Sequence, residues 1–119
     1  MILFNHPLIE SENFYPVNSI EEISQTHSNS IVRFTFSNAN VKLLRYCTEN
    51  GVRTAVEVEN ITEAILASNL EATYILVTEE SATNIQKVAE TYLFDAKIIA
   101  FSNDIEKMAL LGVDGLLFS

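Results

Sequence analysis

Two carboxylates stand two residues apart in the stretch AVEVEN at positions 55–60. In an extended strand alternate side chains share a face, so Glu57 and Glu59 would lie on one side and two valines on the other. Two carboxylates that close can raise the pKa of one of them, as acid/base catalysis requires. The pair could also bind a cation or face solvent. We favour an ion pair between Glu57 and Arg33 of the preceding predicted strand, with Glu59 solvated, and keep binding and catalysis by Glu57 as alternatives.

Polar side chains also stand at or near the carboxyl ends of the predicted strands, where α/β proteins bind ligands. Hydroxyl and amide side chains at such positions also cap the helices that follow, which is the simpler interpretation. The candidates for a face that binds a ligand or a partner are Arg33, Thr35, Glu59, Thr78, Glu79, Ser102 and Asn103.

The remaining reactive side chains offer no recognisable site. Cys47 is the single cysteine and falls on the apolar side of a predicted helix, which predicts a buried, inert thiol and no internal disulfide. His6 and His27 do not form a cluster with zinc-ligand spacing. None of the three glycines belongs to a glycine-rich nucleotide loop. We therefore expect neither a structural metal nor a cofactor.

The composition is that of an acidic protein with one core. The chain has 119 residues, of which 48% are apolar. Its formal charge of −9, from 16 acidic and 7 basic residues, opposes binding to nucleic acid and to anionic membranes. No apolar run is long enough to span a membrane, and the amino terminus, MILFNHPL, does not resemble a signal peptide. We expect a cytoplasmic protein.

The elements that would position the candidate residues alternate regularly from residue 31 onward. β-branched and aromatic residues fill the strand-like runs, and apolar residues at helical spacing mark one side of each stretch between them. Consecutive βα units of this kind require right-handed crossovers and a mainly parallel sheet. The predicted strands are 31–36, 53–59, 73–79, 97–102 and 114–119, and the predicted helices are 40–51, 60–70, 81–94 and 103–112.

Helix boundary signals agree with these units. Asn60 and Asn103 are each followed three residues later by a glutamate, the pattern of an N-cap with a carboxylate at N3. Gly51 and Gly112 stand where a left-handed residue would end a helix. These signals mark at least one end of the predicted helices 40–51, 60–70 and 103–112.

The amino-terminal part, 1–30, is less regular than the βα repeats at 31–119. A strand near FYPV and a short helix IEEIS, opened by a capping box at Ser19 and Glu22, predict one more βα unit. We therefore expect a single domain over 1–119 with about five to six strands in its sheet.

Two α/β architectures fit these elements. A flavodoxin-like, doubly wound three-layer sandwich buries both faces of its central strands, which should then be apolar on both sides. Two predicted strands are not, because Arg33 and Thr35 alternate with apolar residues in one, as Glu57 and Glu59 do in another. If all helices lie on one side, the opposite face becomes a barrel interior, where polar residues at strand ends are expected. The pattern favours a half (β/α) barrel and leaves the sandwich as the alternative.

Two stretches resemble a known family. RTAVEVENITEAILASNL, at 53–70, is similar to a strand and helix of the indole-3-glycerol phosphate synthases. FSNDIEKMALLGVDGLLFS, at 101–119, is similar to the penultimate loop, the following helix and the final strand of the same family. Residues 31–119 together resemble about the last five βα units of a ribulose-phosphate-binding barrel. The tripeptide Val-Glu-Val around Glu57 is the most distinctive part.

The resemblance implies that Glu57 is the active-site carboxylate of a lyase that closes a ring and releases CO₂ in tryptophan biosynthesis. Other family positions differ, since Thr78 and Glu79 replace an asparagine, and Phe-Ser-Asn at 101–103 replaces a Glu-Ser-Gly turn that binds phosphate. The family's catalytic lysines have no counterpart in the first two predicted strands, and its phosphate-binding helix would come after Ser119. We therefore expect an incomplete synthase site.

The favoured functional hypothesis is a non-catalytic or partner-dependent domain. Five parallel strands cannot close a barrel of eight, so apolar residues on the inner face would need to be covered by a second copy or another protein. We therefore expect a homo-oligomer or a protein partner. The alternative is a lyase or binding protein for a phosphorylated sugar or an anthranilate-derived compound, with Glu57 in its site.

Overall fold

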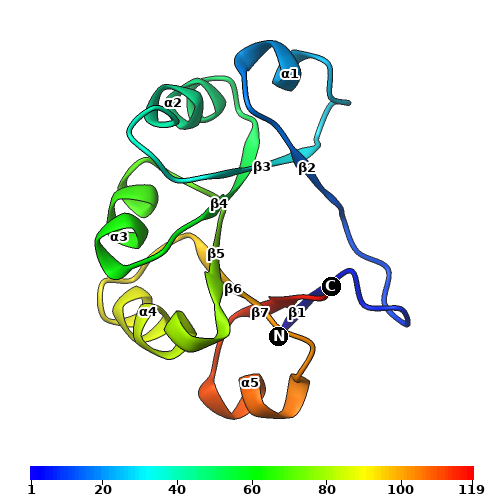
Figure 1. The fold of residues 1–119 in the computed structure, drawn as a ribbon, viewed down its shortest axis with the longest axis vertical. Coiled ribbons are helices and arrows are strands. Elements are labelled where there is room, and N and C mark those ends of the chain that lie inside the picture. The colour runs from blue at the N-terminus through cyan, green and yellow to red at the C-terminus, as the bar shows by residue number, and fades with distance from the viewer.

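The computed structural model describes residues 1–119 as a seven-stranded, all-parallel sheet with five helices (Figure 1). The strand order is β1-β7-β6-β5-β4-β3-β2. The strands are β1 (Ile2–Phe4), β2 (Phe14–Pro16), β3 (Ile31–Thr35), β4 (Arg53–Glu57), β5 (Tyr74–Thr78), β6 (Lys97–Phe101) and β7 (Gly115–Leu117). The helices are α1 (Ile20–Ser24), α2 (Val41–Glu49), α3 (Ile61–Asn69), α4 (Glu79–Thr91) and α5 (Ile105–Leu111).

The βα repeats lie where the sequence predicts them, and the amino-terminal unit is formed by β2 and α1. The sheet has one strand more than the expected five to six, because β1 pairs in parallel with β7. A strand of three residues carries too little alternation to be counted from its sequence alone. Its identity as a strand depends on the hydrogen bonds it makes to β7.

All five helices cover the convex side of the curled sheet (Figure 1). The fold is therefore the expected half barrel and not the doubly wound sandwich. The larger core lies between the sheet and the helices, where alternate strand residues such as Val32, Val56 and Ile98 are fully buried. The helices present their apolar faces to these residues, as their spacing predicts.

The concave side of the sheet holds a second, smaller core built from the chain's own side chains. The ring of Phe4 lies 4.7 Å from that of Phe14 and 5.3 Å from that of Tyr74, measured between centroids. Ile31 and Leu76 beneath them are fully buried. The expected uncovered apolar face is therefore not found, because aromatic side chains reach across the open side of the half barrel and bury the inner apolar residues.

The two edge strands, β1 and β2, follow each other in the chain and do not pair. Residues 5–13, which we call the strap, connect them across the open side of the half barrel (Figure 1). Val17 donates a backbone hydrogen bond to Arg33 of β3 at 3.0 Å, so the backbone of Pro16, one residue earlier, faces the gap. Proline has no N–H to offer a further strand, which protects this edge.

The N-caps predicted at Ser19 and Asn60 are confirmed. Ser19 Oγ accepts a hydrogen bond from the backbone N–H of Glu22 at 3.2 Å, and Asn60 Oδ1 accepts one from that of Glu63 at 2.9 Å. These bonds satisfy amide groups that the first helical turn leaves free.

The N-cap predicted at Asn103 is wrong by one residue. Asp104 caps α5, because its Oδ1 accepts from the backbone N–H of Lys107 at 3.1 Å. The side chain of Asn103 instead bonds to Ser119 at the far end of the chain, with Oδ1 accepting from the backbone N–H at 3.1 Å. The side chain of Asn103 therefore bonds to a residue distant in the sequence and not to the first turn of α5.

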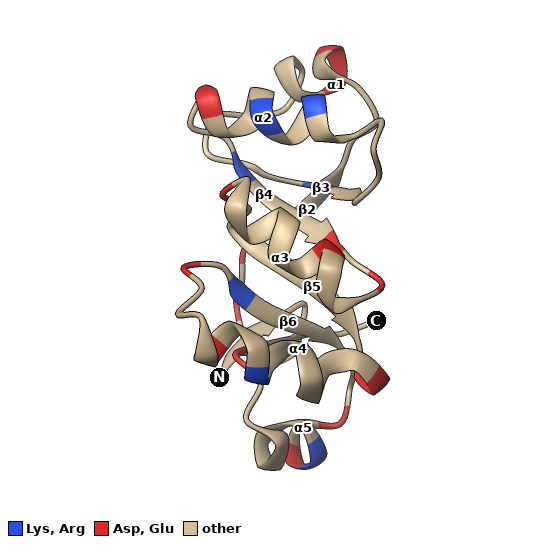
Figure 2. Cartoon of the chain, turned by 90° about the vertical axis from the view of Figure 1, so that its left-hand side faces the viewer, with Lys and Arg blue, Asp and Glu red and all other residues tan.

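Charged side chains are scattered over the helices and strand ends. On the side seen in Figure 2, Lys and Arg do not form a continuous basic stripe, and acidic residues lie among them. None of the helices is both long enough and apolar enough to cross a bilayer.

Candidate functional site

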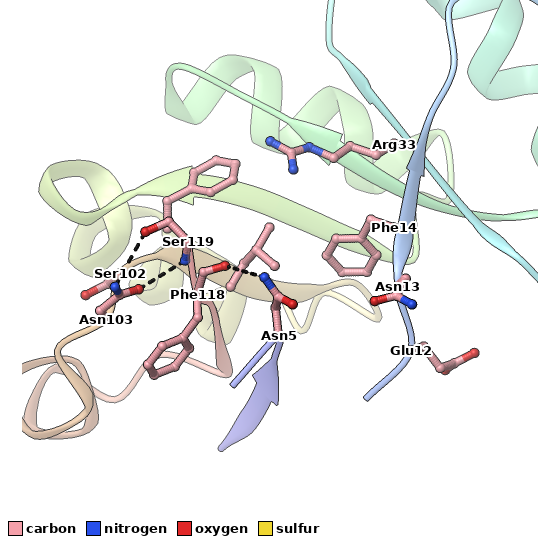
Figure 3. A pocket seen from close by; sticks show the side chains of 11 residues that line it. Asn5, Glu12, Asn13, Phe14, Arg33, Ser102, Asn103, Phe118 and Ser119 are labelled. Atoms are coloured by element: carbon pink, nitrogen blue, oxygen red, sulfur yellow. Dashed lines mark hydrogen bonds between the residues drawn. The ribbon is translucent and has the colours of Figure 1, made fainter. Parts of the chain in front are cut away.

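A pocket of about 630 Å³ opens on the concave side of the sheet, between the strap and the carboxyl ends of β6 and β7 (Figure 3). Parallel α/β sheets bind ligands at this end of their strands. The polar lining residues are Asn5, Glu12, Asn13, Arg33, Ser102, Asn103 and Ser119, and the apolar ones are Phe14, Phe101, Leu117 and Phe118.

Arg33 is the one cationic side chain in the pocket lining. Its Nη2 donates to Glu57 Oε1 at 2.7 Å, and the hydroxyl of Thr35 donates to Glu57 Oε2 at 3.0 Å. The guanidinium carbon lies 5.1 Å from the centre of the Phe101 ring, a cation–π distance. The predicted ion pair between Arg33 and Glu57 is confirmed, and together these contacts orient the guanidinium.

The ion pair uses only part of the Arg33 guanidinium. Arginine carries five N–H donors, and the bond to Glu57 is the single hydrogen bond that this side chain donates within the chain. Both side chains of the pair are 30% exposed, so water reaches them. Arg33 extends over the pocket in Figure 3. Its free donors suit a carboxylate or phosphate, which guanidinium groups bind through two parallel hydrogen bonds.

Asparagine side chains build the opposite wall of the pocket. Asn5 Nδ2 donates to the backbone oxygen of Phe118 at 3.1 Å, and Asn103 Oδ1 accepts from the backbone N–H of Ser119 at 3.1 Å (Figure 3). These bonds join the carboxyl ends of β1, β6 and β7. Asn5 has a φ angle of 65°, in the left-handed region that asparagine tolerates better than most residues. The wall is therefore a fixed polar surface.

The strap contributes Glu12 to the pocket, but the carboxylate is already paired. Arg53 at the start of β4 donates to both of its oxygens, with Nη1 at 2.9 Å from Oε1. The hydrogen bond from Arg53 lowers the pKa of Glu12, against the opposing effect of burial. This pair fastens the strap to the sheet and leaves no free base on this side of the pocket.

Ser102, at the end of β6, belongs to a second polar cluster. Its hydroxyl donates to Glu79 Oε2 at 2.6 Å and accepts from the backbone N–H of Asp104 at 3.0 Å. Lys107 Nζ donates to Glu79 Oε1 at 2.8 Å, and the hydrogen bonds from Lys107 and Ser102 lower the pKa of Glu79. Because the serine proton is held by a weakly basic carboxylate, the hydroxyl is not an activated nucleophile.

The structure brings together part of the predicted ligand or partner face. Arg33, Ser102 and Asn103 line the pocket. Glu57 binds Arg33 from outside the lining, and Thr35 in turn donates to Glu57.

The other predicted residues serve elsewhere. Thr78 is the N-cap of α4, with its hydroxyl accepting from the backbone N–H of Ser81 at 3.3 Å, as the capping interpretation predicted. Glu79 binds Lys107 and Ser102 outside the pocket. Glu59 is exposed beyond the end of β4 and does not line the pocket.

Sequence reasoning missed the pocket residues near the two chain ends. Asn5 directly follows the apolar run ILF, as the other polar candidates follow their strands, so the sequence held a signal for it. Asn13, Phe14 and Phe118 carried none, because apolar residues are expected in any strand and asparagine is common in loops. Their place in the pocket depends on how the sheet curls.

The lining favours binding over proton transfer. It contains no histidine, cysteine or lysine, and the chain holds no group of three or more His, Cys, Asp or Glu arranged to hold a metal ion. Cys47 is buried, as predicted, and burial raises the pKa of its thiol to about 11. The lining places one cationic side chain, Arg33, beside aromatic side chains.

No protein-family model and no curated protein sequence matches the chain. The half barrel itself agrees with the resemblance noted for residues 31–119, and the comparisons add no support for the synthase family in particular.

Proposed function

We propose that this protein is a non-catalytic module that binds a small organic anion. The supporting observation is the guanidinium of Arg33, which is held by Glu57 at 2.7 Å and keeps free donors over a pocket of about 630 Å³. Ligand sites in proteins commonly have volumes of about 300–1,000 Å³. The pocket is formed by a single chain, so binding does not require a partner.

The lining favours a ligand with one acidic group and an apolar or aromatic body. One guanidinium can bind one carboxylate or phosphate group in the parallel geometry of two N–H···O bonds. The apolar side chains of Phe14, Phe101, Leu117 and Phe118 offer surfaces on which a ring can pack. The asparagines provide donors and acceptors for polar substituents.

Proton transfer is not part of this proposal. Both oxygens of Glu57 already accept hydrogen bonds, from Arg33 and from Thr35, and Glu57 does not line the pocket, so it is not placed to act directly on a ligand there. Glu12 is similarly occupied by Arg53. A general base in this pocket would have to be created by breaking one of these pairs.

Replacing Arg33 with glutamine tests the proposal. Benzoate, anthranilate, ribose 5-phosphate and inorganic phosphate are the probes, with thermal unfolding and titration calorimetry as measurements. An organic anion at about 100 times its Kd should stabilise the wild-type protein by about 2.7 kcal/mol. Inorganic phosphate should bind more weakly because it lacks an apolar body. The R33Q variant should lose the stabilisation and still show the circular dichroism of the folded protein.

The matched control is Arg45→Gln, which removes the same charge from the exposed surface of α2. This variant should bind the probes like the wild type. Equal stabilisation of R33Q and the wild type would contradict the proposal, because the anion would then bind elsewhere. Binding that is lost in both variants would indicate attraction by overall charge alone.

The second candidate function is a lyase related to the indole-3-glycerol phosphate synthases. It is supported by the position of Glu57, which lies on the inner face of β4 and contacts a pocket residue, Arg33. Release of CO₂ from an anthranilate-derived sugar phosphate is the assay. Glu57→Gln should abolish turnover and keep the fold, whereas a pure binding module shows no turnover with either chain.

We also retain association with a second copy or another protein as a proposal. The inner face of the half barrel is filled by Phe4, Phe14 and Tyr74, so an interface would use the outer surface. Light scattering over a range of concentrations measures the solution mass. A constant value near 13.3 kDa would exclude a homo-oligomer and leave a different protein as the partner.

A further inference from the structure

Four helices of this fold are followed, at or just after the C-cap, by a residue with a left-handed backbone conformation. The turn residue has a φ angle of 68° at Gly51, 69° at Glu71, 53° at Leu93 and 80° at Gly112. Glycine is favoured at such positions, because a Cβ atom is strained there. The two glycines are those that the sequence predicts. The turns after α3 and α4 carry a glutamate and a leucine against this preference.

The turns after α2 and α4 make equivalent hydrogen bonds. The backbone N–H of Val52 donates to the oxygen of Cys47 at 2.8 Å, and that of Phe94 donates to the oxygen of Ala89 at 2.9 Å. A Cβ atom added at either turn glycine would meet nothing within 4 Å. Hydrogen bonding and the space around the turn therefore do not explain why the turns after α3 and α4 lack glycine.

The two turns without glycine border one groove. It has a volume of about 460 Å³, lies between the carboxyl-terminal ends of α3 and α4, and includes Ile65, Glu71, Tyr92, Leu93, Phe94 and Asp95 in its lining. Tyr92 and Leu93 are 71% and 84% exposed. Leu93 thus combines an unfavourable backbone conformation with exposed apolar surface, both of which lower the stability of the isolated chain.

We propose that this groove docks a basic, amphipathic segment of another protein. Glu71 and Asp95, the two charged residues in its lining, are both acidic. A second copy of the chain would bring a formal charge of −9 to a face of the same sign and be repelled. A helix with leucines on one face and lysines or arginines beside them complements both the apolar rim and the acidic flanks.

The test uses a synthetic helical peptide with leucines at positions i, i+3, i+4 and i+7 and lysines beside them. Fluorescence anisotropy of the labelled peptide reports its binding to the full chain. Leu93→Asn should weaken binding at least about tenfold, because it removes the most exposed apolar side chain of the groove and keeps both acidic residues. Asparagine tolerates the left-handed turn, so the midpoint of thermal unfolding should equal or exceed that of the wild type. Loss of binding without loss of stability separates docking from folding.

Leu110→Asn is the control variant, since Leu110 is 89% exposed on α5 and does not line the groove. It should bind the peptide like the wild type. A peptide with the same residues in scrambled order should bind at least about tenfold more weakly, since it measures charge attraction alone. Equal binding of the two peptides, or an unchanged affinity of L93N, overturns the proposal. A concentration-dependent dimer that L93N abolishes would assign the groove to a second copy and overturn it as well.

Discussion

Two regions of the half-barrel interior are built from different kinds of side chain. In the inner apolar cluster, Phe4, Phe14 and Tyr74 contact one another and close the open side with apolar surface. At the carboxyl end, Arg33 and Glu57 form a partly exposed ion pair beside a pocket of about 630 Å³. The same strands contribute to both regions, because β3 supplies Ile31 to the apolar cluster and Arg33 to the ion pair, and β4 supplies Ala55 and Glu57 in the same way.

The difference separates folding from binding. A packed apolar layer stabilises the fold by roughly 25 cal/mol for each Å² removed from water. A partly solvated ion pair beside an open pocket contributes little, and its free donors are available to a ligand. Substitutions of Phe4 or Tyr74, which do not line the pocket, should therefore lower stability and spare anion binding. Substitutions at the carboxyl end should change anion binding and spare most of the stability.

The largest effect is expected for Phe4→Ala in the inner apolar cluster. Phe4 is 4% exposed, and its removal would leave a cavity between Phe14 and Tyr74. We expect a loss of about 3–4 kcal/mol in the free energy of unfolding, measured by denaturant titration. Phe118→Ala, at the half-buried pocket wall, should cost less than half as much. Similar losses of unfolding free energy in both variants would refute the proposal that the apolar cluster, and not the pocket region, carries most of the stability.

Gly115→Ala should have the next largest effect, at the junction of β1 and β7. A Cβ atom at Gly115 would lie 2.6 Å from the backbone oxygen of Ile2 and 2.8 Å from Ile99 Cδ1. Because a backbone atom cannot move aside easily, β1 would be displaced, at a cost of about 1–3 kcal/mol in unfolding free energy. Hydrogen exchange at Leu3 and Phe4 would report the loosened strand. Unchanged exchange and stability would show that the sheet absorbs the added methyl group.

Glu57→Gln tests how much the ion pair at the carboxyl end contributes to stability and to anion binding. Because both partners of the ion pair are 30% exposed, we expect a loss of at most about 1 kcal/mol in unfolding free energy. The affinity for organic anions should fall more clearly, since Arg33 loses the partner that orients it. Calorimetry on E57Q and the wild type measures both quantities. A stability loss as large as that of Phe4→Ala would mean that the ion pair belongs to the structural core.

The smallest effect concerns the acid dependence of stability near Glu79. The bonds from Lys107 and Ser102 lower the pKa of this carboxyl below its unfolded value of 4.5. A group with a lowered folded pKa stabilises the protein above its unfolded pKa, and that contribution is lost as the pH falls through the folded pKa. Glu79→Gln should therefore flatten the decline in melting temperature from about pH 6 to about pH 3. An equally steep decline would assign it to other carboxyls, such as Glu12, whose pKa is also lowered.

Local signals predicted the repeating part of the fold well. The βα units, the N-caps at Ser19 and Asn60 and the left-handed glycines at 51 and 112 all depend on residues a few positions apart. The ion pair between Arg33 and Glu57 could also be predicted, because adjacent strands of a parallel sheet place such side chains side by side.

The pocket could be predicted only in part, because its contacts join distant parts of the chain. Asn5 and Phe118 are bonded across 113 positions, and no sequence period connects them. Asn103 was predicted as a helix cap and instead bonds to Ser119, because the pairing of β6 with β7 places the ends of these strands side by side.

By itself, the sequence determined the order and limits of the βα units and the burial of Cys47, because periodicity and capping operate within one or two turns of chain. Only the tertiary structure decided that Phe4, Phe14 and Tyr74 close the inner face and that Arg33 lines a pocket. The physical reason is the curvature of the sheet. It is set by the pairing of all seven strands together, and it determines which strand ends face one another.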